Sequence, residues 1–434
     1  MRFLKLFLFL CIISKQSNSA NLNVVRDAET ENLFKEIAIE LMKDSKFDAN
    51  KISFFIDNQD FINAFVLPGQ KIFLTTRLLI ESKRIDDIAG VIGHEIGHII
   101  GGHFTQRLKA MEQSSMINII SSILAAGAMA AGAGSAGTAL LMGGQKLGTG
   151  RLLSFSRTQE SLADQTAIRL LKNSGFSLEG MLNIFKILER NESLKKINPY
   201  FLTHPLSSER KKVIEMNLLN QNKKNFKSLN LKFSLVKAKV NGFFLEDFEL
   251  KNLYPDLETL ESLYAYSLRN YKIGKINVAL KLVDKCIKID PKNPYFHELK
   301  GQILFENGNS NESVLAFRRA IFLKSDEKSF NLFLAKSLYH SDAKQSFSES
   351  IDLLWKYIKD DDFPYEAWHY LGLNYGKLQK YDLSSYALAE KYLLVNQLEN
   401  AKIHIKRVKQ VSKDKILLNK VTDLEKEIKK RENR

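Results

Sequence analysis

The sequence predicts a mainly α-helical protein, with an α+β domain in its N-terminal half and a helical solenoid in its C-terminal half. Two observations carry this prediction. Apolar residues alternate as they do in strands on both sides of Pro68 and Gly69, whereas the flanking segments show helical spacing. From about Thr259 onward a pattern recurs with a period of about thirty-four residues, which is typical of helical tetratricopeptide repeats.

Length and composition limit the number of domains, the class of protein and the partners that the chain can have. The 434 residues are enough for two or three domains, and 26% charged with 44% hydrophobic residues is an ordinary globular balance. The net charge of +15 favours acidic surfaces, such as anionic lipid head groups or nucleic acid. No nucleic-acid motif accompanies this charge, and the basic residues are spread through helical segments. We therefore interpret them as solvated helix faces and expect no nucleic-acid partner.

Residues 1–20 have the organisation of a cleaved signal peptide. Arg2 and Lys5 precede the apolar run 6–13, and small residues lead to Ala20, after which we expect cleavage. The apolar run is too short to span a membrane. The exported chain would keep one cysteine, Cys286, so we expect no internal disulfide and a packing role for this thiol.

The elements expected in residues 21–215 begin with a helix over 30–42 and a strand over 51–56. Residues 63–67 and 71–75 then read as a β-hairpin around the Pro68–Gln70 turn. An exposed edge of this hairpin can accept an extended peptide as an added strand.

The segment after the hairpin contains His94, Glu95 and His98 in an H-E-x-x-H arrangement. Residues four apart share one face of a helix, so both imidazoles can reach one metal ion, and Glu95 lies near that ion without binding it. The flanking residues are apolar, which predicts a buried helix in which unpaired imidazoles would be costly. One zinc ion per chain is the metal that such ligands suit, with a position left for water.

A third ligand comes from a helix expected over residues 156–171. Glu160 and Asp164 are one turn apart, so both can face the metal helix. We expect Glu160 to bind zinc and Asp164 to accept the outer N–H of a ligand histidine. His103 is too far along the helix from His94 to bind the same ion, and we expect it to have a supporting role.

Residues 113–145 carry no charge and are rich in Ala, Gly and Ser. The stretch is long enough to span a bilayer, but its glycines weaken a helix and its apolar content is light. We interpret it as a hairpin beside the cleft or a segment that faces a membrane surface.

A helix over 178–188 is followed by the loop that carries His204. Pro205 biases the preceding backbone towards an extended form, and the chain between Glu160 and His204 is long enough to fold back over the metal. Two roles are open for His204. It can fill the fourth zinc position and make the enzyme latent, which we favour, or it can donate a hydrogen bond to the oxyanion during turnover.

The remaining chain divides into three parts. Residues 216–258 are interpreted as a connecting region, residues 259–412 as the repeat domain, and residues 413–434 as a basic closing helix. The best repeat has Trp368, with Leu371, Gly372 and Tyr375 at the spacing that the pattern requires. Stacked repeats present a concave face, so we expect this domain to dock partners separately from catalysis.

These motifs together resemble the Ste24/HtpX-type gluzincin zinc metallopeptidases. The resemblance rests on residues 63–69 with Asn-Ala-Phe and Pro-Gly, on residues 94–98, on residues 157–164, and on residues 203–205 with Arg210. The glycines at positions 97, 101 and 102 stand where such proteins often carry bulkier residues. The resemblance implies a zincin-like catalytic domain that hydrolyses peptide bonds, with Glu95 as the general base.

A signal peptide precedes this domain and repeats follow it, so the resemblance implies a more specific class of protein. The expected protein is a periplasmic endopeptidase, peripheral to the outer membrane, that degrades misassembled outer-membrane proteins. Its repeats would dock the outer-membrane assembly machinery. Two alternatives remain open from the residues: a repeat-based periplasmic chaperone or adaptor with little or no proteolytic activity, and a zinc hydrolase with a substrate other than protein.

Overall fold

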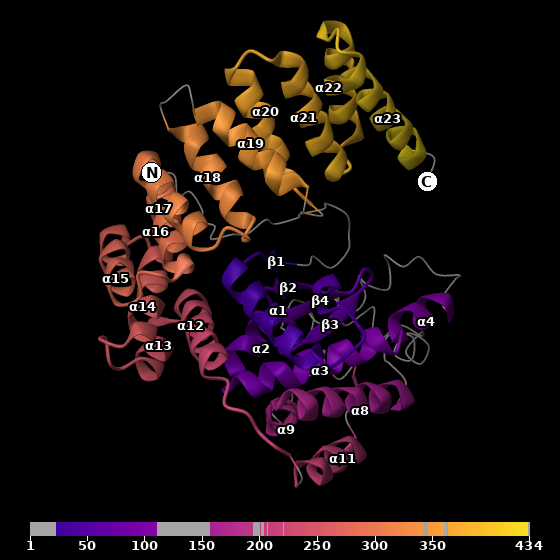
Figure 1. Ribbon diagram of the computed structural model, residues 1–434, viewed down its shortest axis with the longest axis vertical. Coiled ribbons are helices and arrows are strands. Elements are labelled where there is room, and N and C mark those ends of the chain that lie inside the picture. The colour runs from indigo at the N-terminus through magenta and orange to yellow at the C-terminus, as the bar shows by residue number, and fades with distance from the viewer. Residues whose placement is uncertain are drawn as a thin grey trace. The chain divides into compact units, whose positions relative to one another are not determined.

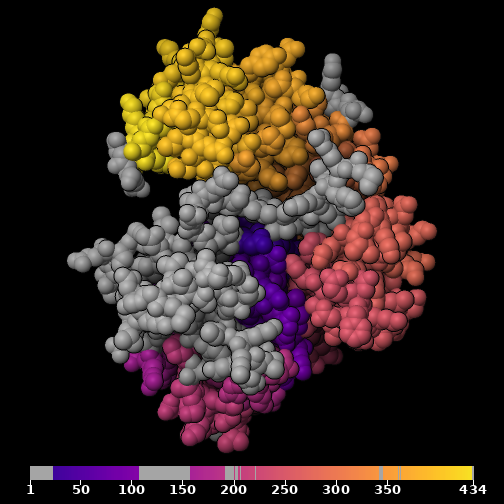
Figure 2. Space-filling model, turned by 180° about the vertical axis from the view of Figure 1, so that it is seen from behind, coloured from indigo at the N-terminus to yellow at the C-terminus, as the bar shows by residue number. Residues whose placement is uncertain are grey.

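The computed structural model describes two compact units, Met1–Tyr254 and Pro255–Arg434. The described residues are coloured in Figures 1 and 2 and the others are grey; they are 23–110, 157–193, 200, 204–205, 207–219, 221–341, 346–359, 361 and 363–432. The expected signal peptide (1–20) and the uncharged stretch (113–145) lie outside them. Among the helices described, none combines the length and the apolar character needed to cross a membrane.

The first unit contains a four-stranded sheet in the order β1-β2-β4-β3. The strands are β1 (Val24–Val25), β2 (Ser53–Asp57), β3 (Ala64–Leu67) and β4 (Lys71–Thr75). Strands β3 and β4 are antiparallel and form the expected hairpin, in which Gly69 and Gln70 take the positive φ angles of the turn. Strand β2 runs parallel to β4, and β1 runs antiparallel to β2, so β3 is an edge strand among the described elements.

Helices cover this sheet and supply most of the core (Figure 1). They are α1 (Ala28–Met42), α2 (Thr76–Glu81), α3 (Ile85–Ile100), α4 (His103–Ala110), α8 (Arg157–Ser174), α9 (Glu179–Ser193), α11 (Ser208–Leu218), α12 (Lys227–Phe244) and α13 (Asp247–Leu253), with a 3₁₀ turn at Ala49–Lys51. Helix α3 is buried along nearly its whole length and packs against α8 and α9. A buried helix in this position holds its side chains in fixed directions, which a metal centre requires.

The start of α3 is fixed by carboxylates. Asp87 accepts hydrogen bonds from the backbone N–H groups of Lys83 and Arg84, at 2.7 and 3.1 Å. Asp86 accepts one from the backbone N–H of Ser177, at 2.6 Å, just before α9. Negative side chains satisfy the unpaired donors at a helix N-terminus and complement its dipole. These contacts anchor the end of α3 that lies away from the metal-binding motif.

The region 216–258 does more than connect the two units, and our interpretation of it is corrected here. Residues 227–244 form α12, whose Phe233, Val236 and Val240 belong to the core of the first unit. Lys239 of α12 is buried and pairs with Asp27 and Glu29 at the start of α1. Helix α12 is rich in Lys and Asn but still presents one apolar face to the core. The first unit thus includes α12 and extends to the end of α13.

The second unit consists of helices alone within its described residues, arranged in successive antiparallel pairs. They are α14 (Leu260–Lys272), α15 (Ile276–Ile289), α16 (Pro294–Glu306), α17 (Ser310–Leu323), α18 (Ser329–His340), α19 (Ser346–Ile358), α20 (Tyr365–Lys377), α21 (Tyr381–Leu394), α22 (Leu398–Val411) and α23 (Lys415–Glu432). Thr259 caps α14, where the repeats were expected to begin, and Trp368, Leu371 and Tyr375 are buried. The mainly α fold with a repeat solenoid is confirmed.

Small residues set the distance between α3 and α8. A Cβ atom added at Gly97 would lie 2.6 Å from the carbonyl oxygen of Ala163 and 2.8 Å from its Cα atom. At Gly93, one turn earlier, an added Cβ would lie 3.6 Å from the nearest atoms of Ala167, an ordinary contact. The two backbones therefore approach most closely at Gly97, between the two histidines of the motif, and this glycine is a requirement of packing.

Gly97→Ala and Gly93→Ala form a matched pair that tests this close approach. We expect Gly97→Ala to destabilise the zinc-free protein by about 1–3 kcal/mol, because the added methyl group meets backbone that cannot move aside. Gly93→Ala should be neutral or stabilising by up to about 1 kcal/mol, since alanine is the better helix former. Urea denaturation of both variants measures the difference, and equal midpoints would contradict the packing argument.

Candidate metal centre

Helix α3 presents its three motif side chains within the protein interior. His94 is 2% exposed, and Glu95 and His98 are fully buried. The Nε2 atoms of His94 and His98 lie 3.1 Å apart, so both imidazoles point to the same place, as their four-residue spacing predicts. Glu95 leaves the helix in a different direction, beside this meeting point.

Helix α8 brings Glu160 to the two histidines. The Oε1 atom of Glu160 lies 3.2 Å from Nε2 of His98, and its Oε2 atom lies 3.4 Å from Nε2 of His94. Asp164, one turn later, lies behind the site, with its Oδ1 atom 2.9 Å from Nδ1 of His94. A carboxylate in that place accepts the outer N–H of the imidazole and turns Nε2 towards the site. The structure thus brings together the residues that the sequence singled out on α3 and α8.

His204 comes to the same point from the loop before α11. It is fully buried, and its Nδ1 atom lies 3.1 Å from Oε1 of Glu160 and 3.3 Å from Nε2 of His94. Its ring stacks on Tyr200, with ring centroids 4.7 Å apart. The sequence predicted that this loop folds back to the metal site, but it gave no sign of the tyrosine beneath the imidazole.

Arg210 is the residue whose role the sequence did not reveal. Its guanidinium donates to both oxygens of Asp164, at 2.6 and 2.9 Å, and to the backbone carbonyl of Pro205, at 2.9 Å. It also lies 2.7 Å from Oε2 of Glu160. One cation therefore holds the carboxylate behind His94, the carboxylate among the histidines, and the loop of His204. The fork-shaped donor set of arginine suits such multiple contacts.

The four converging side chains fit a zinc ion. One ligand atom from each of His94, His98, Glu160 and His204 lies within 4.8 Å of the other three, and all four residues are buried. Ligand atoms about 2.0–2.2 Å from a tetrahedral zinc ion lie roughly 3.3–3.6 Å from one another. Five separations among the nitrogen and oxygen atoms of these residues are 3.1–3.4 Å. Imidazole and carboxylate donors at this spacing suit zinc.

The pKa shifts of the two motif histidines are consistent with a bound cation at the site. Burial lowers the pKa of His98 well below its ordinary value, so its imidazole is neutral, as a ligand must be. Burial also opposes the charged form of His94, but Asp164 and Glu160 outweigh it and raise the pKa of His94 to about 10. The surroundings of His94 thus stabilise a positive charge. A bound metal ion would supply that charge in place of the proton.

Glu95 has a different environment from the ligands. Both of its carboxylate oxygens are buried, and neither has a hydrogen-bond partner among the described residues. Its Oε1 atom lies 3.7 Å from Nε2 of His204. Burial raises the pKa of Glu95, which makes its carboxylate a stronger base than an exposed one. A buried carboxyl group without partners is costly, so its presence points to a chemical role.

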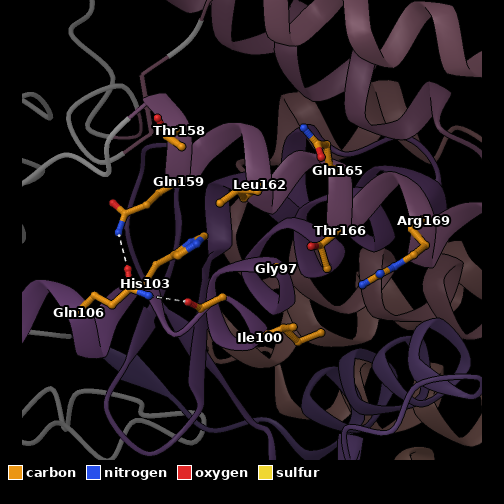
Figure 3. A pocket seen from close by; sticks show the side chains of 11 residues that line it. Gly97, Ile100, His103, Gln106, Thr158, Gln159, Leu162, Gln165, Thr166 and Arg169 are labelled. Atoms are coloured by element: carbon orange, nitrogen blue, oxygen red, sulfur yellow. Dashed lines mark hydrogen bonds between the residues drawn. The ribbon is translucent and has the colours of Figure 1, made fainter.

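His103 supports the site from outside the ligand set. Its Nδ1 atom lies 3.0 Å from Nδ1 of His98, on the side of that ring away from Nε2. Figure 3 shows His103 among the residues of α3, α4 and α8 that line a pocket. The volume of this pocket is about 900 Å³. Gln106 closes one side of this pocket by donating to the carbonyl of Gly101 at 3.1 Å. The expectation that His103 has a supporting role therefore agrees with its position.

Asp164→Asn tests the carboxylate behind His94. We expect zinc affinity to fall about 10–100-fold, because the amide cannot match the charge that fixes His94 and Arg210. Competition with a zinc-selective chelator measures the affinity, and Asp60→Asn, at an exposed carboxylate, serves as the control. An unchanged affinity in Asp164→Asn would show that the site does not depend on this group.

Comparison with known proteins agrees with the site. Residues 27–217 match the family model described as Peptidase family M48. The chain is 25% identical over 366 residues to the β-barrel assembly-enhancing protease of Escherichia coli, covering 80% of this chain and 72% of the relative. It is 26% identical over 298 residues to the protein of the same name from Yersinia pestis, covering 65% and 60%.

A third relative shares a shorter region. Metalloprotease YcaL of Escherichia coli is 30% identical over 136 residues, which are 30% of this chain and 49% of that protein. The matched family region includes both helices that carry the motif residues, α3 and α8, together with the His204 loop and α11. In these residues the chain is therefore similar to the metallopeptidases of Peptidase family M48.

Proposed function

We propose that the protein is a zinc-dependent endopeptidase of the periplasm that degrades misassembled outer-membrane proteins and assists their assembly through its repeats. The observation that carries this proposal is the meeting of four buried zinc-type donors beside Glu95, a buried carboxylate without a hydrogen-bond partner among the described residues. Such a constellation suits metal-assisted hydrolysis.

In this proposal His94, His98 and Glu160 hold the zinc ion, and Asp164 with Arg210 fixes their orientation. A bound zinc ion supplies the Lewis acidity that polarises the scissile carbonyl and lowers the pKa of the attacking water towards about 7. Glu95 accepts a proton from that water while the water oxygen forms a bond to the carbonyl carbon. It then delivers the proton to the leaving amine nitrogen as the C–N bond breaks.

His204 restrains this chemistry. In the structure its Nδ1 atom lies 3.3 Å from Nε2 of His94 and 3.1 Å from Oε1 of Glu160. There it would supply a fourth donor to a tetrahedral zinc ion and take the place of a water molecule. We therefore propose a latent enzyme that becomes active when the His204 loop moves away. The other role, a hydrogen bond from His204 to the oxyanion, requires the imidazole to stay near the site but outside the ligand set.

The edge strand β3 is the proposed docking place for the substrate backbone. It packs on α3, which carries the metal-binding motif. The backbone N–H of Thr75 bonds to the carbonyl of Asn63, and bonded pairs alternate along an antiparallel ladder. Phe65 and Leu67 therefore bond to β4, whereas the backbone groups of Ala64 and Val66 point away from β4. An extended peptide can bond to these groups as an added strand.

The substrate class and location follow from the relatives and from the expected signal peptide. The matches over 366 and 298 residues are to proteins named for enhancing β-barrel assembly, and both are longer than the region that matches Peptidase family M48. Stacked helical repeats offer an extended face for protein partners. These observations support outer-membrane proteins as substrates and their assembly machinery as a partner of the repeats.

Glu95→Gln tests the proposed catalysis. We expect the variant to bind zinc as the unsubstituted protein does, since Glu95 is not a ligand, and to cleave unfolded casein roughly a hundredfold more slowly or worse. Zinc content and casein cleavage with and without chelator are measured together, with Glu258→Gln, at an exposed carboxylate, as the control. Chelator-resistant cleavage, or full activity in Glu95→Gln, would refute the mechanism. Absence of cleavage in every form, the His204→Ala protein included, would favour the adaptor alternative.

His204→Ala distinguishes the two roles of the loop histidine. If His204 fills the fourth position, we expect casein cleavage to be faster at unchanged zinc stoichiometry, because the substitution opens that position. If His204 stabilises the oxyanion, the substitution should raise the activation free energy by a few kcal/mol. The rate should then fall about 10²–10³-fold. The control is His297→Ala in the repeat unit, and an unchanged rate in His204→Ala would exclude both roles.

A further inference from the structure

Two lysines of the second unit lie among aromatic rings, and the first of them, Lys336 of α18, has a carboxylate partner. Its Nζ atom lies 5.5–5.9 Å from the centroids of three rings, those of Phe305, Phe333 and Tyr370. The same atom donates to Oε2 of Glu366 at 2.8 Å. A cation that loses much of its contact with water needs such a partner. The unit itself therefore compensates the charge of Lys336.

The second lysine, Lys391 of α21, has similar surroundings but no carboxylate. Its Nζ atom lies 5.1 Å from the ring centroid of Tyr365 and 5.0 Å from that of Tyr392. It donates one hydrogen bond, 3.3 Å long, to Nδ1 of His369. Lys391 is only 9% exposed, and no carboxylate of the described residues is close enough to pair with it. An ammonium group has three donors, so two of them remain for a partner.

Two imidazoles beside Lys391 also have ring nitrogens without partners. Because Nδ1 of His369 accepts from Lys391, its proton lies on Nε2, which makes no hydrogen bond with the described residues. His404 of α22 stacks on Tyr392, with ring centroids 5.4 Å apart, and its buried Nδ1 atom has no partner in the described part of the chain. Burial, and then nearby cations that include Lys391, lower the pKa of both imidazoles. Both rings are thus neutral at neutral pH and do not compensate the lysine.

These side chains form one surface on three successive helices. Helix α21 packs against both α20 and α22, which supply the other members (Figure 1). The rings around Lys391 are partly exposed, so a partner can reach them, whereas Lys391 lies nearly buried among them. We call this set the Lys391 surface; its members are Tyr365, His369, Lys391, Tyr392 and His404.

We propose that the Lys391 surface binds a carboxylate of a polypeptide partner, together with an apolar or aromatic side chain next to that carboxylate. This inference rests on the proposed docking role of the repeats and names the chemistry of the partner. Within the same unit, Lys336 and Glu366 show the arrangement that binding would complete, with a carboxylate on a lysine among rings. The partner's carboxylate belongs either to an acidic side chain or to the C-terminus of its chain.

Lys391→Met and Lys336→Met form a matched pair in stability. Both substitutions keep a long apolar side chain against the rings and remove the charge. Lys336→Met leaves Glu366 without its partner, so we expect a lower midpoint of urea denaturation. Lys391→Met removes a charge that has no carboxylate partner, so its midpoint should be unchanged or higher. A midpoint that falls as far in Lys391→Met as in Lys336→Met would overturn the inference, because Lys391 would then be satisfied within the unit.

Binding is measured on the zinc-loaded full chain with Glu95→Gln, which leaves peptides intact. The probes are two labelled Ser-rich peptides with a phenylalanine next to the carboxylate. One has an internal aspartate and an amidated end, and the other has no acidic residue and a free C-terminus. We expect at least one of them to bind. Lys391→Met should weaken that binding roughly 10- to 100-fold, the contribution of a hydrogen bond to a charged group, and Lys336→Met should keep it.

Neutral versions of the probes identify the source of the carboxylate. Asparagine in place of the aspartate, or amidation of the free end, should weaken the probe that binds as much as Lys391→Met does. Binding of neither probe, or equal binding by Lys391→Met, would overturn the inference. Chelator-sensitive casein cleavage by the His204→Ala protein, measured alongside, tests the proposed peptidase function independently of these results.

Discussion

The close approach of α3 and α8 is the constraint on which the metal centre depends. Gly97 lies between His94 and His98 along α3, and it touches the backbone of Ala163, which lies between Glu160 and Asp164 along α8. The contact of the two helices therefore lies at the centre of the ligand set. A larger side chain at position 97 would separate the helices at the point where their ligands must meet. Gly97 is therefore a condition for the site.

The second constraint is electrostatic. Glu160 and Asp164 are buried carboxylates, and burial opposes their ionisation. Neighbouring positive groups outweigh this effect, so the pKa of each carboxyl lies below its usual range: chiefly His204 and His94 beside Glu160, and His94 and Arg210 beside Asp164. Buried charges persist only when they are paired in this way. Because Arg210 also holds the carbonyl of Pro205, the same pairing that stabilises the ligands fixes the loop of His204.

Apart from His204, the parts of the site that the sequence predicts are those with local periodicity. The spacing of His94 and His98, and of Glu160 and Asp164, places each pair on one helix face, and the structure has them there. The hairpin was predictable because Gly69 marks its turn. Arg210 entered only through the family resemblance, and its contacts and those of Tyr200 were not predicted, because they are made across the fold and follow no spacing rule. Helix α12 was missed because its Lys and Asn residues obscure the apolar face that carries Val236.

The route to activity follows from what must move. His204 is held by its neighbours among the ligand atoms and by stacking on Tyr200, and its loop is held by the bond from Arg210 to Pro205. His94, His98 and Glu160 come from two helices that are locked together at Gly97. Displacement of the loop therefore leaves three donors in place and opens the fourth position beside Glu95. If His204 restrains the enzyme as we propose, restraint and metal binding are separated, because His204 lies on a loop whereas His94, His98 and Glu160 lie on packed helices.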